Sequence, residues 1–408
     1  MAAFNSLCSK TSNNLFFLAL FGSSAAHTSL KMPPKPKHTP AQSTTALIDL
    51  TKTTRTLLAH FQSSLQPTSI TKNVSAEFSS ATPIPDPLRV LKSTTTLLRS
   101  HTTTLSLLLL TPPFSPTAIN KKIGEVSSGV LSSMIAAVVP PSPSQQDSIS
   151  TLMRVELRAQ IRRILSSWDD VLALVLRISE ARVGGGKKAD KELEEQEKQE
   201  VLSATGVVWE GCDRLVKTID EGVVGLVVKR AEEWRSVLLD AVQELKEWGE
   251  DIDEEESDGD EGVGSGDEQD EFADEDDIFG AANKLGKGDK ELKEVLDRSV
   301  MRLKMVGVLY QALIKRRLKT FPQKDGKSDL MGVLEQLMRV LKAIPESVDE
   351  LASAFYDLDE TEARKVVERC CEEAKEAVGL VRQGWNGSDD EFTAWSGKWI
   401  AALDARGV

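Results

Sequence analysis

Apolar residues recur every three or four positions through most of this chain, and prolines interrupt each run. That spacing places them on one face of an α-helix, whereas a half-buried strand needs strict alternation. The first run, residues 41–66, carries Leu47, Leu50 and Leu57 and stops at Pro67. Aromatic residues make up only 5% of the sequence, which further disfavours a β-sandwich or barrel. We therefore expect helices joined by proline and glycine turns, and no strand.

The other runs share this spacing and similar Pro or Gly boundaries. They cover residues 87–111, 116–140, 147–183, 201–248, 291–320, 330–344, 360–382 and 389–405. Pro345 is expected to begin a short additional helix, and Gly222 and Gly225 to split or kink the run that contains them. The pattern predicts an all-α protein, an up-down helical bundle of about ten helices in two halves, interrupted by a disordered acidic loop.

One dense acidic tract accounts for the net charge of −13. Residues 247–277 contain 18 Asp and Glu and no Lys or Arg, and without them 45 acidic residues face 50 basic ones. The basic residues are spread along the predicted helices, and the tract repels phosphates. Direct nucleic-acid binding needs a dense basic patch on one face, so the charge pattern argues against it.

These patterns divide the chain into four parts. They are a disordered tail over 1–40, an N-terminal bundle over 41–248, an acidic disordered linker over 249–284, and C-terminal helices over 285–408 that pack on or beside the bundle. The tail contains L-F-F-L-A-L-F at 15–21, which has the form of a weak signal peptide. Secretory targeting by residues 1–26 is therefore an alternative to a plain tail or to a start at Met32. No run is long enough to span a membrane.

Residues suited to catalysis or metal binding are scarce, with only four His and four Cys. Scattered cysteines without a C-x-x-C motif indicate reduced, buried thiols. His60 and His101 have no acidic partner four residues away, and neither a G-x-S-x-G motif nor a P-loop is present. The nearest approach to a calcium loop begins at Glu254 and has Ser265 where a bidentate Glu is required. We expect no enzymatic activity, no cofactor and no metal site.

Several residues suggest regulation or partner contact. Ser257 and Ser265 each have an acidic residue three positions later, which suits an acid-directed kinase, and phosphate there would extend the tract further. Trp395 and Trp399 are four residues apart and share a helix face, where they cap the core or anchor a partner. The basic run at 315–319 suits the negative end of a helix dipole, with nuclear import as the alternative.

Three segments carry a family resemblance: V-W-E-G-C at 208–212, E-D-D-I-F-G at 275–280, and S-V-D-E-L-A-S-A-F-Y at 347–356. Their order and spacing resemble the cyclin-D-binding protein family, also called Grap and cyclin-D interacting protein (GCIP), and suggest a fungal-type or divergent member. Asp357 and Leu358 stand where the family has prolines.

This resemblance implies an all-helical, non-enzymatic protein of two bundle-like halves. It implies protein partners of the cyclin or transcription-regulator kind, held by sequestration in nucleus and cytoplasm, with Asp276 and Asp277 as candidate contacts alongside the tryptophans. Capture of an amphipathic partner helix in a groove between helices is the expected mechanism. A structural or cytoskeletal scaffold of the vinculin and catenin type is the alternative function.

Overall fold

The computed structural model describes residues 40–66, 84–140, 149–183, 192–250, 285–286, 289–322 and 328–407. Every regular element in these ranges is an α-helix or a π-helical turn, and none is a strand. The all-α prediction is therefore confirmed. Apart from their boundary residues, the predicted tail (1–40) and the predicted acidic linker (249–284) lie outside the described residues.

The first group of helices surrounds one hydrophobic core. It consists of α1 (Pro40–Ser64), α3 (Pro87–Leu110), α4 (Pro116–Glu125), the π-helical turn η2 (Val126–Leu131), α5 (Ser132–Val138), α6 (Thr151–Val183) and the first half of α7 (Glu195–Glu250). Pro87 and Pro116 occupy first helical turns, where a missing N–H costs no hydrogen bond. Leu98, Ile161 and Trp168 are fully buried in this core.

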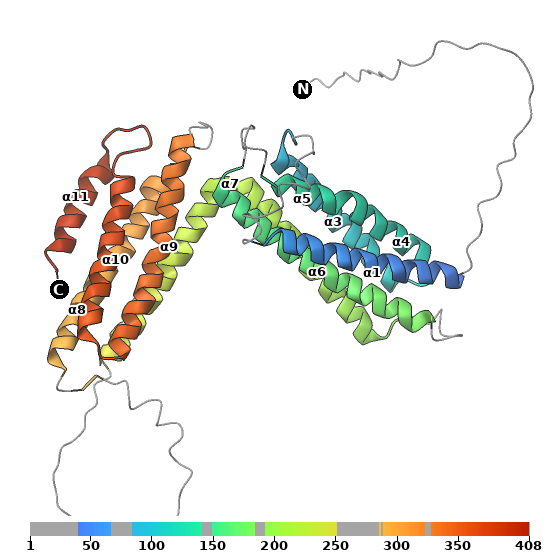
Figure 1. The fold of residues 1–408 in the computed structure, drawn as a ribbon, viewed down its shortest axis with the longest axis horizontal. Helices are drawn as coiled ribbons and strands as arrows, with labels where there is room; N and C mark the ends of the chain where they lie inside the picture. Colours follow the sequence, from blue (N-terminus) through green and yellow to red (C-terminus); the bar gives the residue numbers. More distant parts are fainter. Residues whose placement is uncertain are drawn as a thin grey trace, which may run out of the picture. The chain divides into compact units, whose positions relative to one another are not determined.

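A second core belongs to the C-terminal helices. These are the second half of α7, α8 (Lys290–Leu313) with the π-helical turn η5 (Ile314–Leu318), α9 (Ser328–Tyr356), α10 (Glu360–Leu380) and α11 (Glu391–Asp404). Figure 1 shows α8, α9, α10 and α11 running along one another. Only residues 357–359 join α9 to α10, so these two helices pair as an antiparallel hairpin.

Helix α7 contributes to both cores, and its backbone changes conformation between them. Leu215 belongs to the first core and Val227 to the second. Gly222, between these residues, has φ 65° and ψ −163°, a combination open almost only to glycine. A Cβ at Gly225 would lie 2.4 Å from the Glu221 Cβ. The predicted kink at these glycines is thus present. The division between the two cores falls inside α7.

Pro345 does not begin a new helix, as the sequence suggested, but lies inside α9. A proline inside a helix leaves the carbonyl four residues earlier, here that of Leu341, without its N–H donor. The buried hydroxyl of Tyr310, on α8, donates a hydrogen bond to this carbonyl. Burial also raises the pKa of Tyr310, which keeps the hydroxyl protonated as a donor. A contact from a neighbouring helix thus compensates for the proline, and the sequence prediction was wrong because it treated α9 in isolation.

We predict a specific coupling between Tyr310 and Pro345. Tyr310→Phe should lower the free energy of unfolding by roughly 1–3 kcal/mol, because the Leu341 carbonyl stays buried without a donor. In a Pro345→Ala background the backbone N–H at position 345 can replace the hydroxyl, so the same change should cost less. Urea unfolding of the four proteins of this double-mutant cycle measures the coupling. Equal costs in both backgrounds would contradict the proposed compensation.

A second prediction concerns the kink in α7. Gly222→Ala should destabilise the protein by roughly 1–3 kcal/mol, because alanine at φ 65° and ψ −163° is strained. Gly206→Ala is the control, since that helical position is open and has no neighbouring atom within 4 Å of an added Cβ. It should leave stability unchanged or raise it. Thermal unfolding compares the two, and an equally mild effect at both positions would show that the kink is not needed.

Candidate binding cleft

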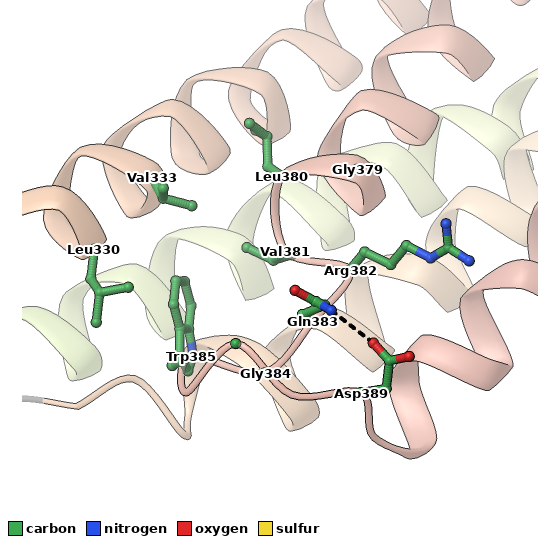
Figure 2. Close-up of a pocket in the computed structure, with 11 residues that line it drawn as sticks. Leu330, Val333, Gly379, Leu380, Val381, Arg382, Gln383, Gly384, Trp385 and Asp389 are labelled. Atoms are coloured by element: carbon green, nitrogen blue, oxygen red, sulfur yellow. Dashed lines mark hydrogen bonds between the residues drawn. The ribbon is translucent and has the colours of Figure 1, made fainter.

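A cleft of about 650 Å³ opens at the end of the C-terminal helices, between α9, α10 and the loop 381–390. Figure 2 shows Leu330 and Val333 on its α9 side, and Trp385, Gln383 and Asp389 on its loop side. The Gln383 amide donates a 3.0 Å hydrogen bond to the Asp389 carboxylate across the rim. The cleft therefore combines an apolar wall with a polar edge.

The indole of Trp385 is fixed by two contacts behind the cleft. Its Nε1–H donates to the Arg317 carbonyl at 2.8 Å. Its ring meets Phe321 edge to face, with ring centres 4.9 Å apart and planes at 85°. Both contacts come from η5 and the residues that follow it. Because the ring is held in this way, the apolar wall of the cleft is preorganised rather than formed on binding.

Arg317 also fixes the loop that carries Trp385. Its side chain is almost fully buried. Nε donates to the Val381 carbonyl at 2.6 Å, and Nη2 donates to the Arg382 carbonyl at 2.9 Å. The guanidinium also lies 4.4 Å from the centre of the Phe392 ring, which favours a cation over its face. One side chain thus satisfies the first carbonyls beyond α10 and sets the path of the loop.

Asp390 closes this arrangement at the start of α11. Its two carboxylate oxygens accept hydrogen bonds of 2.7 and 2.9 Å from the Arg317 guanidinium, a bidentate pair. The same carboxylate caps α11 by accepting from the Thr393 N–H, and the Thr393 hydroxyl accepts from the Asp390 N–H in return. The Arg317 hydrogen bond, followed by the Thr393 N–H, holds the pKa of Asp390 well below its ordinary value.

The tip of the loop is a tight turn. Gly387 has φ 79°, and its N–H donates to the Gly384 carbonyl at 2.8 Å. The Gly384 N–H donates to the Ser388 carbonyl at 2.9 Å, so the turn is closed from both sides. Asn386 stabilises it by accepting from the Ser388 N–H at 3.1 Å. An Asn-Gly pair is a strong turn signal because both residues tolerate positive φ.

The cleft is lined by both apolar and polar groups. Its lining contains no His, Cys or Ser side chain, and its charged side chains are Arg382 and Asp389. In Figure 2 the Arg382 guanidinium extends away from Trp385. Among the described residues, no three His, Cys, Asp or Glu side chains lie close enough to hold a metal ion.

The predicted tryptophan contacts lie on α11, outside the cleft lining. Trp399 is buried in the second core, and its Nε1–H donates to the Met305 carbonyl at 3.0 Å. Trp395 is half-buried and stacks on Trp399, with ring centres 6.3 Å apart. Of the two roles left open by the sequence, Trp399 caps the core, and only Trp395 keeps a surface face. The other predicted site residues, Ser257, Ser265, Asp276 and Asp277, lie outside the described residues.

Two of the three motifs that carry the family resemblance lie in helices, 208–212 in α7 and 347–356 in α9, and the third, 275–280, lies outside the described residues. Val208 and Cys212 are buried on α7, and burial raises the pKa of the Cys212 thiol to about 12. The Arg99 guanidinium lies over the Trp209 ring, 5.3 Å from its centre. Ser347 donates to the Glu373 carboxylate at 3.0 Å, between α9 and α10. These contacts hold helices together, and as predicted the described cysteines are buried thiols.

Sequence reasoning missed the residues that build the cleft. The basic run at 315–319 suggested a dipole or import signal, yet Arg317 is buried in a network that binds distant segments. Arg316 pairs with Glu391 at 2.6 Å and Lys319 with Glu232 at 3.8 Å. Two local signals were visible, the Asn386–Gly387 turn and the Asp390–Thr393 capping box. Neither signal identifies Arg317 as the residue that binds this loop, because Arg317 is 73 residues away from Asp390.

The fold defines this chain as an all-α protein with two hydrophobic cores and a surface cleft of mixed polar and apolar lining. The family model "Grap2 and cyclin-D-interacting, N-terminal" matches residues 90–251, from α3 to the end of α7. The predicted resemblance to this family is confirmed over that segment, which ends before the residues that line the cleft. An uncharacterized protein from Schizosaccharomyces pombe is 22% identical over 327 residues, covering 78% of this chain and 84% of that protein.

None of the helices that the structure describes has an apolar stretch long enough to cross a bilayer.

The Asp390 carboxylate should make stability depend on pH in the acid range. Its pKa is lowered in the folded protein, so its contribution is complete above the unfolded value, about 3.9, and is lost as the pH falls toward the folded value. Asp390→Asn should cost about 1–2 kcal/mol at pH 6, because the pair is partly exposed on the Asp390 side. The difference from the native protein should shrink below about pH 4.

Urea unfolding at pH 6 and pH 3 measures this difference. Asp389→Asn is the matched control, because Asp389 is exposed and accepts only from Gln383 among the described residues. It should have a small effect at both pH values. A gap for Asp390→Asn that is equally large at pH 3 would argue against a role of its charge.

Proposed function

We propose that this chain is a non-enzymatic helical protein that binds and sequesters protein regulators of the cell cycle and transcription, with a D-type cyclin as the first partner to test. The observation that carries the proposal is the match of residues 90–251 to a family named for interaction with cyclin D. Nucleus and cytoplasm are the proposed locations, since such partners act there.

The proposed mechanism is capture of an amphipathic partner segment against helix surfaces. Within the matched segment, Leu107 on α3 and Val207 on α7 are large apolar residues with 58% and 51% of their surface exposed. The cleft beside Trp385 offers a second, separate surface, with one apolar wall. The acidic tract at 247–277 would adjust access or attract basic partners through its charge.

A scaffold function of the vinculin and catenin type is the second candidate. The observation that favours it is α7, whose two helical stretches meet at Gly222 and contribute one to each core, so that α7 connects two helical groups. Such a protein would bind cytoskeletal partners and would show no preference for cyclins.

Direct binding between the purified full chain and the D-type cyclins of its own organism tests the proposal. Leu107→Glu and Val207→Glu should each weaken binding by about tenfold or more if these residues contact the partner. Val308→Glu is the control, because Val308 is 50% exposed but lies on α8, outside the matched segment. Circular dichroism should show all three variants folded.

A further arm removes residues 251–277 from the full chain. Loss of cyclin binding in this variant alone would locate recognition in the acidic tract instead of the helix surfaces. Absence of cyclin binding by the native chain would overturn the proposal, and co-sedimentation with actin filaments would then favour the scaffold function.

A further inference from the structure

Three arginines form a row on α6 at spacings of four residues: Arg154, Arg158 and Arg162. Residues four apart lie one above the other on a helix, about 6 Å apart along its axis. Arg154 and Arg158 are each 93% buried, and Arg162 is half-buried. Arg158 is hydrogen-bonded to the last residue of α1, Ser64, and Arg162 to the side chain of Gln66, two residues beyond that helix.

The partners of Arg158 and Arg162 in the described structure are neutral. Arg158 Nη2 donates to the Ser64 carbonyl at 2.8 Å, and Arg162 Nη1 donates to the Gln66 side-chain oxygen at 3.0 Å. No carboxylate among the described residues forms an ion pair with either of them. A guanidinium carries five N–H donors, so most donors of this pair have no acceptor among the residues that the structure describes.

This pattern differs from the other interhelical arginines of the chain. Arg55 pairs with Asp169, Arg302 with Glu368, and Arg317 with Asp390. Burial, followed by the neighbouring charge of Arg154, instead lowers the pKa of Arg158. A buried cation without a counter-ion is costly, and such a group calls for an explanation.

The C-terminal end of α1 supplies only part of the missing negative charge. The dipole of a helix is equivalent to about half an elementary charge at that end. Two guanidinium groups bring two full charges to the same place. Ordinary capping of α1 therefore explains the hydrogen bond of Arg158 to Ser64, but it does not balance the charge of the two arginines.

We propose that Arg158 and Arg162 form an anion site that binds a phosphate monoester on a protein partner. A phosphate dianion brings about two negative charges and three acceptor oxygens, and guanidinium groups bind it bidentately. Nucleic acid is disfavoured, because polyanion binding needs an extended exposed basic surface and these donors are recessed. That the partner is a protein rests on the proposed function. The anion site itself does not depend on cyclin binding.

Phosphate titration of the purified full chain tests the anion site. Inorganic phosphate at constant ionic strength should raise the unfolding midpoint by about 2 °C or more, because it binds the native state alone. Arg162→Gln should abolish this rise. Arg163→Gln is the control, since Arg163 is exposed, one residue further along α6, and its substitution changes the charge equally. An equal rise in both variants, or none in the native chain, would overturn the site.

Fluorescence anisotropy then tests the source of the phosphate. A labelled degenerate peptide pool with a central phosphoserine should bind at least about tenfold more tightly than the same pool with serine, through charge-assisted hydrogen bonds. Arg162→Gln should remove this preference and Arg163→Gln should retain it. No preference, or equally tight binding of a single-stranded oligonucleotide, would overturn the assignment to a phosphorylated protein. Neither assay contains a cyclin, so its result is independent of the cyclin experiment.

Discussion

The fold depends on one helix that belongs to two hydrophobic cores. Helix α7 buries Val208 and Leu215 with α3 and α6, and then buries Val227 and Leu238 with α8 and α9. The face of α7 that packs against other helices must therefore change along the length of α7, and a regular helix cannot make that change abruptly. Gly222 absorbs it, because glycine alone adopts the required backbone conformation without strain. The remaining helices are arranged along either half of α7.

Buried arginines then determine how the helix ends are joined. Arg302 links α8 to α10 through Glu368, and Arg317 links η5 to α11 through Asp390. In both cases a carboxylate balances the charge, so the arginine acts as a structural connection. Arg158 has no carboxylate partner among the described residues, and this difference separates a candidate binding site from structural pairs of the same residue type.

The cleft and the arginine row lie on different elements and suit different chemistry. The cleft belongs to α9, α10 and the loop that Arg317 holds, and it offers an apolar wall. The arginine row belongs to α6, inside the segment matched by the family model, and it offers positive charge. A partner with an apolar helix face and a phosphorylated segment could be recognised by both chemistries. This combination fits a protein whose proposed role is to hold other proteins.

The sequence by itself determined the secondary structure class and most helix boundaries. Apolar spacing and prolines sufficed there, because helix formation depends on residues within one or two turns, as in α3 from Pro87 to Leu110. The family resemblance was also readable, from segments such as Val208 to Cys212. Only the tertiary structure decided the continuity of α9 through Pro345, since its hydrogen-bond donor, Tyr310, is 31 residues away from Leu341. It also decided the role of Arg317, whose acceptors include groups of Val381 and Asp390, more than 60 positions further along the chain. Such contacts depend on how helices pack, and no local pattern encodes which distant group will meet a given side chain.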